Sequence, residues 1–178
     1  HRCIEEIARN VASVPLMLRR ARDGAILDAH PALDLLGAPN PSQSAAAFRH
    51  GLIAHYLISG NAYAELVTDG GDAPAELWLR RPDRMQVVAG SGRLPAAYRT
   101  IAGGTVTRWP VDPVTGRSAI LHFKGFHPLD DWYGLSPLEA AARAIDQFNA
   151  GAAWNQALLQ NGAKPAGTLT SREPLSEA

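Results

Sequence analysis

YGLSPLE, at residues 133–139, contains the clearest local structural pattern of this chain. Ser136 and Glu139 have the spacing of a capping box: the serine side chain accepts from the N–H of Glu139, and the glutamate side chain returns to the N–H of Ser136. Pro137 suits the first helical position, where an N–H would have no partner inside the helix. The stretch therefore predicts that a helix begins at Ser136-Pro137. We expect Ser136→Ala to cost about 1 kcal/mol.

The predicted helix continues without a break to Asn161, because apolar residues recur at helical spacing, and Gly162 can end it. Alanines fill residues 140–142, and Ala150, Ala152 and Ala153 lie on either side of Gly151. Small side chains let other elements approach closely, so we expect close packing on this alanine-rich face. Gly167 begins a further predicted strand over residues 167–170.

The N-terminal part alternates helices with short strands. Apolar residues at helical spacing predict a helix over residues 2–13, with Cys3 on its apolar side and therefore packed as a small hydrophobe. Residues 16–18 indicate a short strand before the turn at residues 23–24, and residues 31–37 indicate a short helix.

Pro39-Asn40-Pro41 then breaks the chain. The next predicted helix is capped by Ser42 or Ser44 and ends at Gly60, where a left-handed conformation is needed. A strand over residues 62–67 follows.

The middle of the chain is rich in β-structure. Turn residues separate five further predicted strands, at residues 76–79, 85–88, 97–101, 105–109 and 120–123. We interpret these short strands as a small antiparallel meander. The predicted fold class is α+β, in which small antiparallel or mixed sheets carry two or three amphipathic helices packed on them.

Composition limits the classes of function. The 178 residues contain 17 Lys and Arg and 17 Asp and Glu, so the formal net charge is zero, which disfavours tight wrapping of DNA. Only 19% of the residues are charged, which suits a surface partly covered by neighbours. No apolar run approaches the roughly 18 residues of a membrane span. His1 is not a methionine, and both ends have the features of a portion of a longer protein.

Catalytic patterns are weak. Residues 134–138 touch on the nucleophile-elbow pattern, but Pro137 removes the N–H that would form the oxyanion hole, so Ser136 is better interpreted as a helix cap. A metal site can be drawn from four residues in and beside the 125–135 loop, although no recognised ligand spacing is present: His122, His127, Asp130 and Asp131. We assign no catalytic, cofactor-binding or metal-binding residue.

Two alternatives remain open from the residues alone. The first is a small soluble enzyme with a site in residues 125–135. The second is a nucleic-acid-binding module, for which two short arginine groups provide local positive charge: Arg19, Arg20 and Arg22, and Arg80, Arg81 and Arg84.

The order of the turn and cap motifs carries a resemblance. The motifs are VASVPL at 11–16, HP at 30–31, LL at 35–36, PNP at 39–41, GNAYA at 60–64, YGLSPL at 133–138 and NGAKPAG at 161–167. In this order the chain resembles the portal proteins of tailed double-stranded-DNA bacteriophages, including their relatives in prophages and gene transfer agents. The matching positions are structural: Pro39, Asn40, Pro41, Gly60, Asn61, Tyr63, Gly134, Ser136, Pro137, Glu139, Asn161, Gly162 and Gly167.

The resemblance implies a structural subunit and no enzyme. Portal proteins form a homo-oligomeric ring, a dodecamer in most members, at one vertex of the capsid, and double-stranded DNA passes through the channel without sequence specificity. The implied partners are the major capsid protein, the terminase large subunit and a head-completion or adaptor protein, with no membrane and no cofactor. The implied location is the virion, preceded by the host bacterial cytoplasm during assembly.

The resemblance also implies which part of a portal subunit this chain forms. We expect residues 1–178 to be a single wing-like domain, followed beyond residue 178 by the channel-lining stem and the clip.

Overall fold

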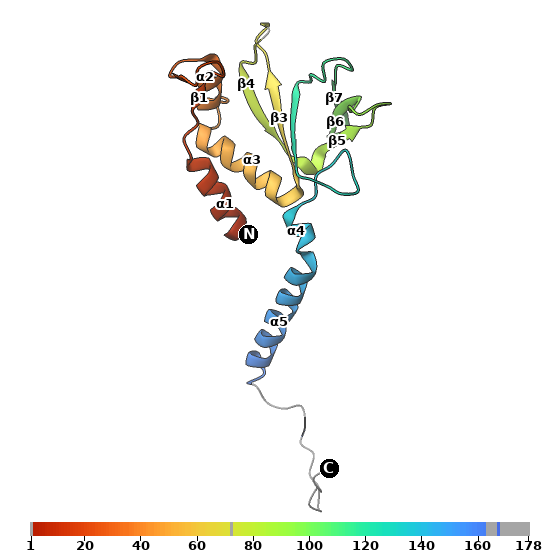
Figure 1. The fold of residues 1–178 in the computed structure, drawn as a ribbon. Helices are drawn as coiled ribbons and strands as arrows, with labels where there is room; N and C mark the ends of the chain where they lie inside the picture. The colour runs from red at the N-terminus through yellow and green to blue at the C-terminus, as the bar shows by residue number, and fades with distance from the viewer. Residues whose placement is uncertain (1, 72, 163–166, 168–178) are drawn as a thin grey trace, which may run out of the picture. The chain divides into compact units, whose positions relative to one another are not determined.

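The computed structural model describes residues 2–71, 73–162 and 167. The chain divides into two compact units, His1–Ala140 and Ala141–Ala178. The first unit contains three helices, a short 3-10 turn, all of the strands and the short helix α4 (Figure 1). The second unit contains helix α5. The α+β class is confirmed.

Helix α1, Arg2–Ser13, forms as predicted and lies against helix α3, Ala45–Ser59. The buried residues of α1 are Ala8 and Ala12, and His50 Nε2 of α3 lies 3.1 Å from Glu5 Oε2. The expected burial of Cys3 is wrong, because the buried contact lies nearer the C-terminal end of α1 and leaves this cysteine exposed.

The ends of helices α2 and α3 follow the local sequence. Helix α2, Pro31–Gly37, begins with the N–H of Ala32 donating to His30 Nδ1 at 3.1 Å. Between the two candidate caps of α3 the structure uses Ser44, whose Oγ accepts from the N–H of Ala47 at 3.2 Å. Gly60 ends α3 in the left-handed conformation, with φ 72°.

The strands form three antiparallel groups, where a single small meander was expected. Strand β3, Asn61–Val67, lies between β4, Glu76–Arg80, and β8, Ile120–Lys124. A second sheet is the meander of β5, Met85–Val88, β6, Ala97–Ala102, and β7, Thr105–Pro110. The meander expectation holds for this second sheet alone, since β8 pairs with β3 across a long sequence separation.

A two-stranded hairpin stands apart from both sheets. Strand β1, Leu18–Arg19, pairs with β2, Ile26–Leu27. The strand expected over residues 16–18 is therefore shorter and begins later. The 3-10 turn η1, Pro82–Arg84, joins β4 to β5.

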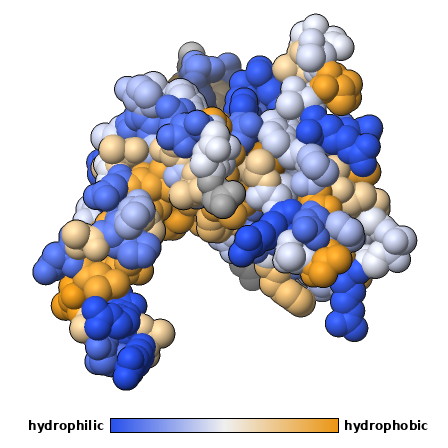
Figure 2. Space-filling model, turned by 90° about the horizontal axis from the view of Figure 1, so that it is seen from above, coloured by the Kyte–Doolittle hydropathy of each residue, from blue (hydrophilic) through white to orange (hydrophobic). Residues whose placement is uncertain are grey.

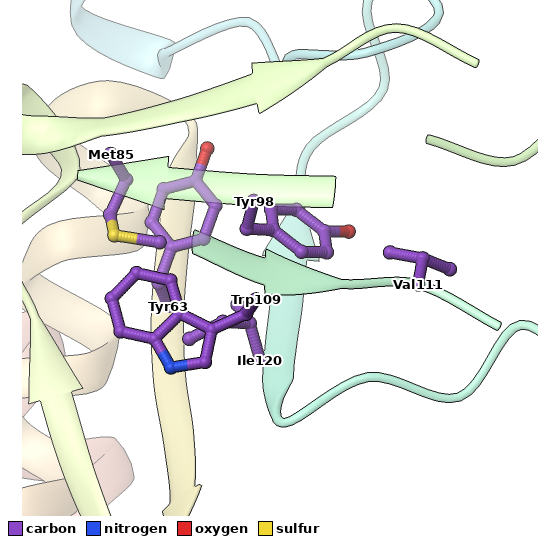
Figure 3. Packing of buried hydrophobic residues seen from close by; sticks show 6 residues of the cluster. All are labelled: Tyr63, Met85, Tyr98, Trp109, Val111 and Ile120. Carbon is purple, nitrogen blue, oxygen red and sulfur yellow. The ribbon is translucent and has the colours of Figure 1, made fainter. Parts of the chain in front are cut away.

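Strand β3 separates two apolar cores, because alternate side chains of a strand point to opposite faces. On one face Tyr63 packs with residues of the second sheet, of the segment just after β7 and of β8 (Figure 3): Met85, Tyr98, Trp109, Val111 and Ile120. On the other face Ala64 packs with Phe48 of α3 and Leu77 of β4. Because both faces of β3 are covered, its first four residues are all buried.

The prediction of a single long helix after Ser136 is wrong. Helix α4, Pro137–Ala140, is followed by Ala141 with φ −97° and ψ 3°, and α5 then covers Ala142–Gln160. The ψ of Ala141 departs from the helical value of about −42°, and this departure interrupts the helix. Gly162, with φ 63°, follows the end of α5 as predicted. Of the strand expected over residues 167–170, all but Gly167 lies outside the described residues.

Helix α5 contains no buried residue, and its Phe148 and Leu159 are both 76% exposed. The alanine-rich face expected to pack closely therefore has no buried contact among the described residues. Across the described part of the chain, no helix has the length and apolar character needed to cross a membrane.

Candidate structural junction around Asn61 and Gly134

The side chain of Asn61 joins the start of β3 to the loop that precedes α4. Its Oδ1 accepts from the N–H of Gly134 at 2.7 Å, and its Nδ2 donates to the carbonyl of Gly134 at 3.1 Å. Nδ2 also donates to the carbonyl of Ser59 at 2.8 Å, and His122 Nε2 lies 3.0 Å from Oδ1. The amide therefore pairs with both backbone groups of Gly134, as a neighbouring strand would.

Three glycines let the backbones meet at this point. Gly125 donates its N–H to the carbonyl of Gly60 at 2.8 Å. A Cβ on Gly134 would overlap the carbonyl of Gly60 and the nitrogen of Gly125, and a Cβ on Gly60 would overlap the carbonyl of Gly134. The crossing therefore requires residues without side chains. Among these glycines, sequence reasoning singled out Gly60 and Gly134 but missed Gly125.

Ser136 fastens the same loop to the last turn of α3. It is 3% exposed, and its Oγ donates to the carbonyl of Ile58 at 2.8 Å, with that of Leu57 also within reach at 3.1 Å. The expected capping box does not form: Oγ accepts from the N–H of Leu138 at 3.1 Å and not from that of Glu139. The hydroxyl is drawn toward the α3 carbonyls, and the Glu139 side chain makes no hydrogen bond within the described residues.

We therefore predict that Ser136→Ala lowers the free energy of unfolding by about 2 kcal/mol, more than the roughly 1 kcal/mol of a cap alone, because the α3 carbonyls also lose a donor. Urea unfolding followed by circular dichroism measures the change. Glu139→Ala is the matched control and is expected to change stability by less than about 0.5 kcal/mol. Equal losses of stability in both variants would contradict this prediction and support the capping box between Ser136 and Glu139.

His122 belongs to the junction. Its ring stacks on Tyr63 at a centroid distance of 4.3 Å. Because Asn61 uses Nδ2 to donate to two carbonyls, its Oδ1 is the acceptor toward His122, so neutral His122 carries its proton on Nε2. Burial, assisted by the positive charge of Lys124, lowers the pKa of His122 to about 4.

Two other members of the drawn metal group, His127 and Asp130, serve local turns. His127 Nδ1 accepts from the N–H of Leu129 at 3.1 Å. Asp130 Oδ1 accepts from the N–H groups of Trp132 and Tyr133, which lower the pKa of this carboxyl. Within the described residues no three His, Cys, Asp or Glu side chains gather as a metal site.

We predict that acid weakens this domain through His122. The unfolded histidine, with a pKa near 6.5, binds a proton more readily than the folded one, with a pKa of about 4. The free energy of unfolding therefore falls as the pH drops from about 6.5 to 4 and is fully retained above 6.5. Urea unfolding across this range, compared with His122→Gln, measures the effect. An unchanged slope in the variant would assign the pH dependence to other groups.

Tyr133 connects the loop to the second sheet, because its hydroxyl accepts from the N–H of Val87 in β5 at 2.9 Å. The 133–138 segment thus contacts α3, β3 and β5 through three neighbouring residues. This explains in physical terms why Gly134 and Ser136 occur in one short motif.

A second group of hydrogen bonds surrounds Asn40. Its Nδ2 donates to the carbonyl of Leu77 at 2.8 Å, while the N–H of Leu77 donates to the carbonyl of Pro39 at 2.6 Å. Asn40 Oδ1 accepts from the N–H and the hydroxyl of Ser42. The Pro39-Asn40-Pro41 segment therefore covers part of the outer edge of β4.

The remaining motif positions have local roles. Tyr63 lies in the core, Pro137 begins α4, Asn161 follows the last turn of α5, and Gly167 is exposed with open space around it.

With this geometry established, the comparisons with known proteins define the class of the chain. The sequence model of the phage portal protein family matches residues 1–178. The chain belongs to the phage portal protein family.

Two relatives match nearly the whole chain. The chain is 34% identical over 174 residues to an uncharacterized protein of Rickettsia bellii (strain RML369-C) and 36% identical over 174 residues to one of Rickettsia felis (strain ATCC VR-1525 / URRWXCal2). Each match covers 97% of this chain and 44% of the relative. The chain therefore spans less than half the length of these relatives.

Solved structures show the same fold. A chain from the neck of an empty GTA particle, computed with C6 symmetry, has a TM-score of 0.79 and 42% identity, covering 94% of this chain and 43% of that one. Chains from the virion of a native gene transfer agent (GTA) particle and from the native neck, computed with C12 symmetry, both have a TM-score of 0.76 and 40% identity. Each of these two covers 94% of this chain and 42% of its own.

Proposed function

We propose that this chain is part of a structural subunit of a portal ring, which forms a channel at the capsid vertex for packaging and ejection of DNA. The observation that carries the proposal is the match to the portal family over all 178 residues. The similarity to chains of gene transfer agent necks and virions, at 40–42% identity, supports it.

The proposed assembly is a homo-oligomeric ring with twelve subunits. The C12 symmetry used for one similar neck structure supports this number. The proposed partners are the major capsid protein, the terminase large subunit, a head-completion or adaptor protein, and double-stranded DNA that passes without sequence specificity. The proposed location is the virion vertex, reached from the host bacterial cytoplasm during assembly.

Within the ring, we assign residues 1–178 to a wing-like domain. The stem and clip would belong to the further length that the relatives have. The junction around Asn61 supports a mechanical role: it binds the loop before α4 to α3 and to both sheets, so that the chain leaves His1–Ala140 from a fixed point.

The proposed role is not enzymatic. The polar groups of the junction form hydrogen bonds with neighbouring parts of the protein: Asn61 pairs with Gly134, Ser136 with α3, and His122 with Asn61. Ser136 is 3% exposed and its Oγ is committed to the α3 carbonyls, so it is not placed as an exposed nucleophile.

Native mass spectrometry of the full-length protein tests the proposal. We expect one dominant closed homo-oligomer, with a mass close to twelve subunits. A protein that remains monomeric or dimeric at concentrations of tens of micromolar would contradict the ring.

A further inference from the structure

The loop between β8 and α4 presents two apolar side chains to solvent. Phe126 is 87% exposed and Leu129 is 90% exposed, which is extreme for residues of this size. We call the part of the loop that carries Phe126 and Leu129 the apolar knob, and we include in it the neighbouring charged residue Asp131. In Figure 1 this loop lies on the side of β5 to β7, whereas α1 lies beyond α3.

The knob is held in shape by its own hydrogen bonds. His127 Nδ1 accepts from the N–H of Leu129, and Asp130 Oδ1 accepts from Trp132 and Tyr133. Lys124 Nζ donates to the carbonyl of Asp131. A braced loop loses little conformational entropy when it binds, so the exposed side chains are organised in advance for a partner.

A groove of about 440 Å³ lies elsewhere in His1–Ala140. Its apolar walls include Val11 and Val14 near the end of α1, and Leu121 and Phe123 of β8. These four side chains remain between 40% and 56% exposed. Figure 2 likewise shows hydrophobic side chains, in orange, reaching the molecular surface among hydrophilic ones. The groove thus leaves a substantial apolar surface in water.

One charged side chain lines this groove. Arg49 donates to the carbonyl of Val14 at 3.3 Å, but its Nε is buried without a hydrogen-bond partner. A buried donor left unpaired costs about 1–3 kcal/mol, so the site favours an occupant that brings an acceptor. Beside the exposed side chains of the knob, the Asp131 carboxylate makes no ion pair or hydrogen bond within the described residues.

We propose that the apolar knob of one subunit occupies the groove of a second copy of this chain, with the Asp131 carboxylate directed toward Arg49. The proposal rests on the proposed function, since it defines a contact between neighbours in the ring. The two surfaces are complementary in apolar character and charge. Because they are different surfaces of one chain, the contact is head-to-tail, which is the type that generates rings when the rotation closes.

Disulfide trapping tests the contact in the full-length protein. Cys3, an exposed residue and the only cysteine of these 178 residues, is first replaced by serine, together with any cysteine in the rest of the full-length protein. Leu129→Cys and Val14→Cys are then combined in this background, and mild oxidation is followed by non-reducing gel electrophoresis. The matched control combines Val14→Cys with Val114→Cys, because Val114 is 88% exposed but lies outside the knob.

We expect the Leu129 and Val14 pair to give a ladder of linked chains beyond the dimer, at least about tenfold more abundant than in the control pair, because neighbours in a ring hold the two thiols at high effective concentration. Asp131→Asn in the same background should reduce the ladder, whereas Asp69→Asn, which changes an exposed carboxylate elsewhere, should not.

Electron microscopy of the same samples separates the two proposals. Rings without a ladder would overturn the knob-and-groove contact and leave the portal ring intact. A link formed within one chain, detected as a faster-migrating monomer, or equal ladders in both cysteine pairs would also overturn the contact. Absence of rings together with absence of the ladder would overturn the proposed function as well.

Discussion

Gly134→Ala is expected to lower the free energy of unfolding by at least about 3 kcal/mol. The new methyl group would overlap backbone atoms of Gly60 and Gly125, which cannot rotate away as a side chain could. Separating the backbones would also lengthen the two hydrogen bonds between Gly134 and Asn61. For a domain of this size, thermal unfolding should shift downward by roughly 6–12 °C.

Gly92→Ala is the matched control for this experiment. Gly92 lies in a loop with open space around the position of a Cβ, so its replacement should leave the unfolding temperature within a degree or two. Differential scanning calorimetry of the three proteins measures the comparison. If Gly134→Ala unfolds at the same temperature as Gly92→Ala, the close crossing of the backbones at the junction is not needed for stability.

Asn61→Leu is expected to have an effect of similar size, about 4 kcal/mol or more, for a different reason. Leucine has the same branching as asparagine but is larger and cannot hydrogen-bond, so the N–H and the carbonyl of Gly134 both lose their side-chain partner. His122 loses its acceptor as well. Each buried polar group left unpaired costs about 1–3 kcal/mol.

Asn155→Leu controls for the chemical change, because Asn155 is exposed on α5. Urea unfolding measured by circular dichroism should show a large loss for Asn61→Leu and almost none for Asn155→Leu. A variant too unstable to purify supports the prediction when the control folds under the same conditions. A loss below about 1 kcal/mol at Asn61 would show that the junction does not depend on its amide.

Local structure was the part of the fold that the sequence could predict. The bounds of α1, the cap at Ser44 and the end of α3 at Gly60 depend on residues within one or two helical turns. The positions of β3 to β8 were predicted for the same reason, whereas β1 begins later than expected and β2 was not predicted. The α+β class follows from these elements, and the portal family follows from the order of their motifs.

Long-range contacts could not be predicted from one sequence. Asn61 and Gly134 are 73 residues apart, and nothing in the local pattern of either indicates the other. The pairing of β3 with β8, which divides β3 to β8 into two sheets, could not be predicted for the same reason. The predicted bond between Ser136 and Glu139 failed because the α3 carbonyls, 78 and 79 residues away, compete for the same hydroxyl group.

Direct imaging of the full-length protein by electron microscopy tests the proposed function most directly. If the chain is part of a portal subunit, two-dimensional class averages will show closed rings with a central hole, viewed along a symmetry axis that we expect to be twelvefold. Compact monomers or dimers at high protein concentration, with no ring in any class, would contradict the assignment to a portal ring.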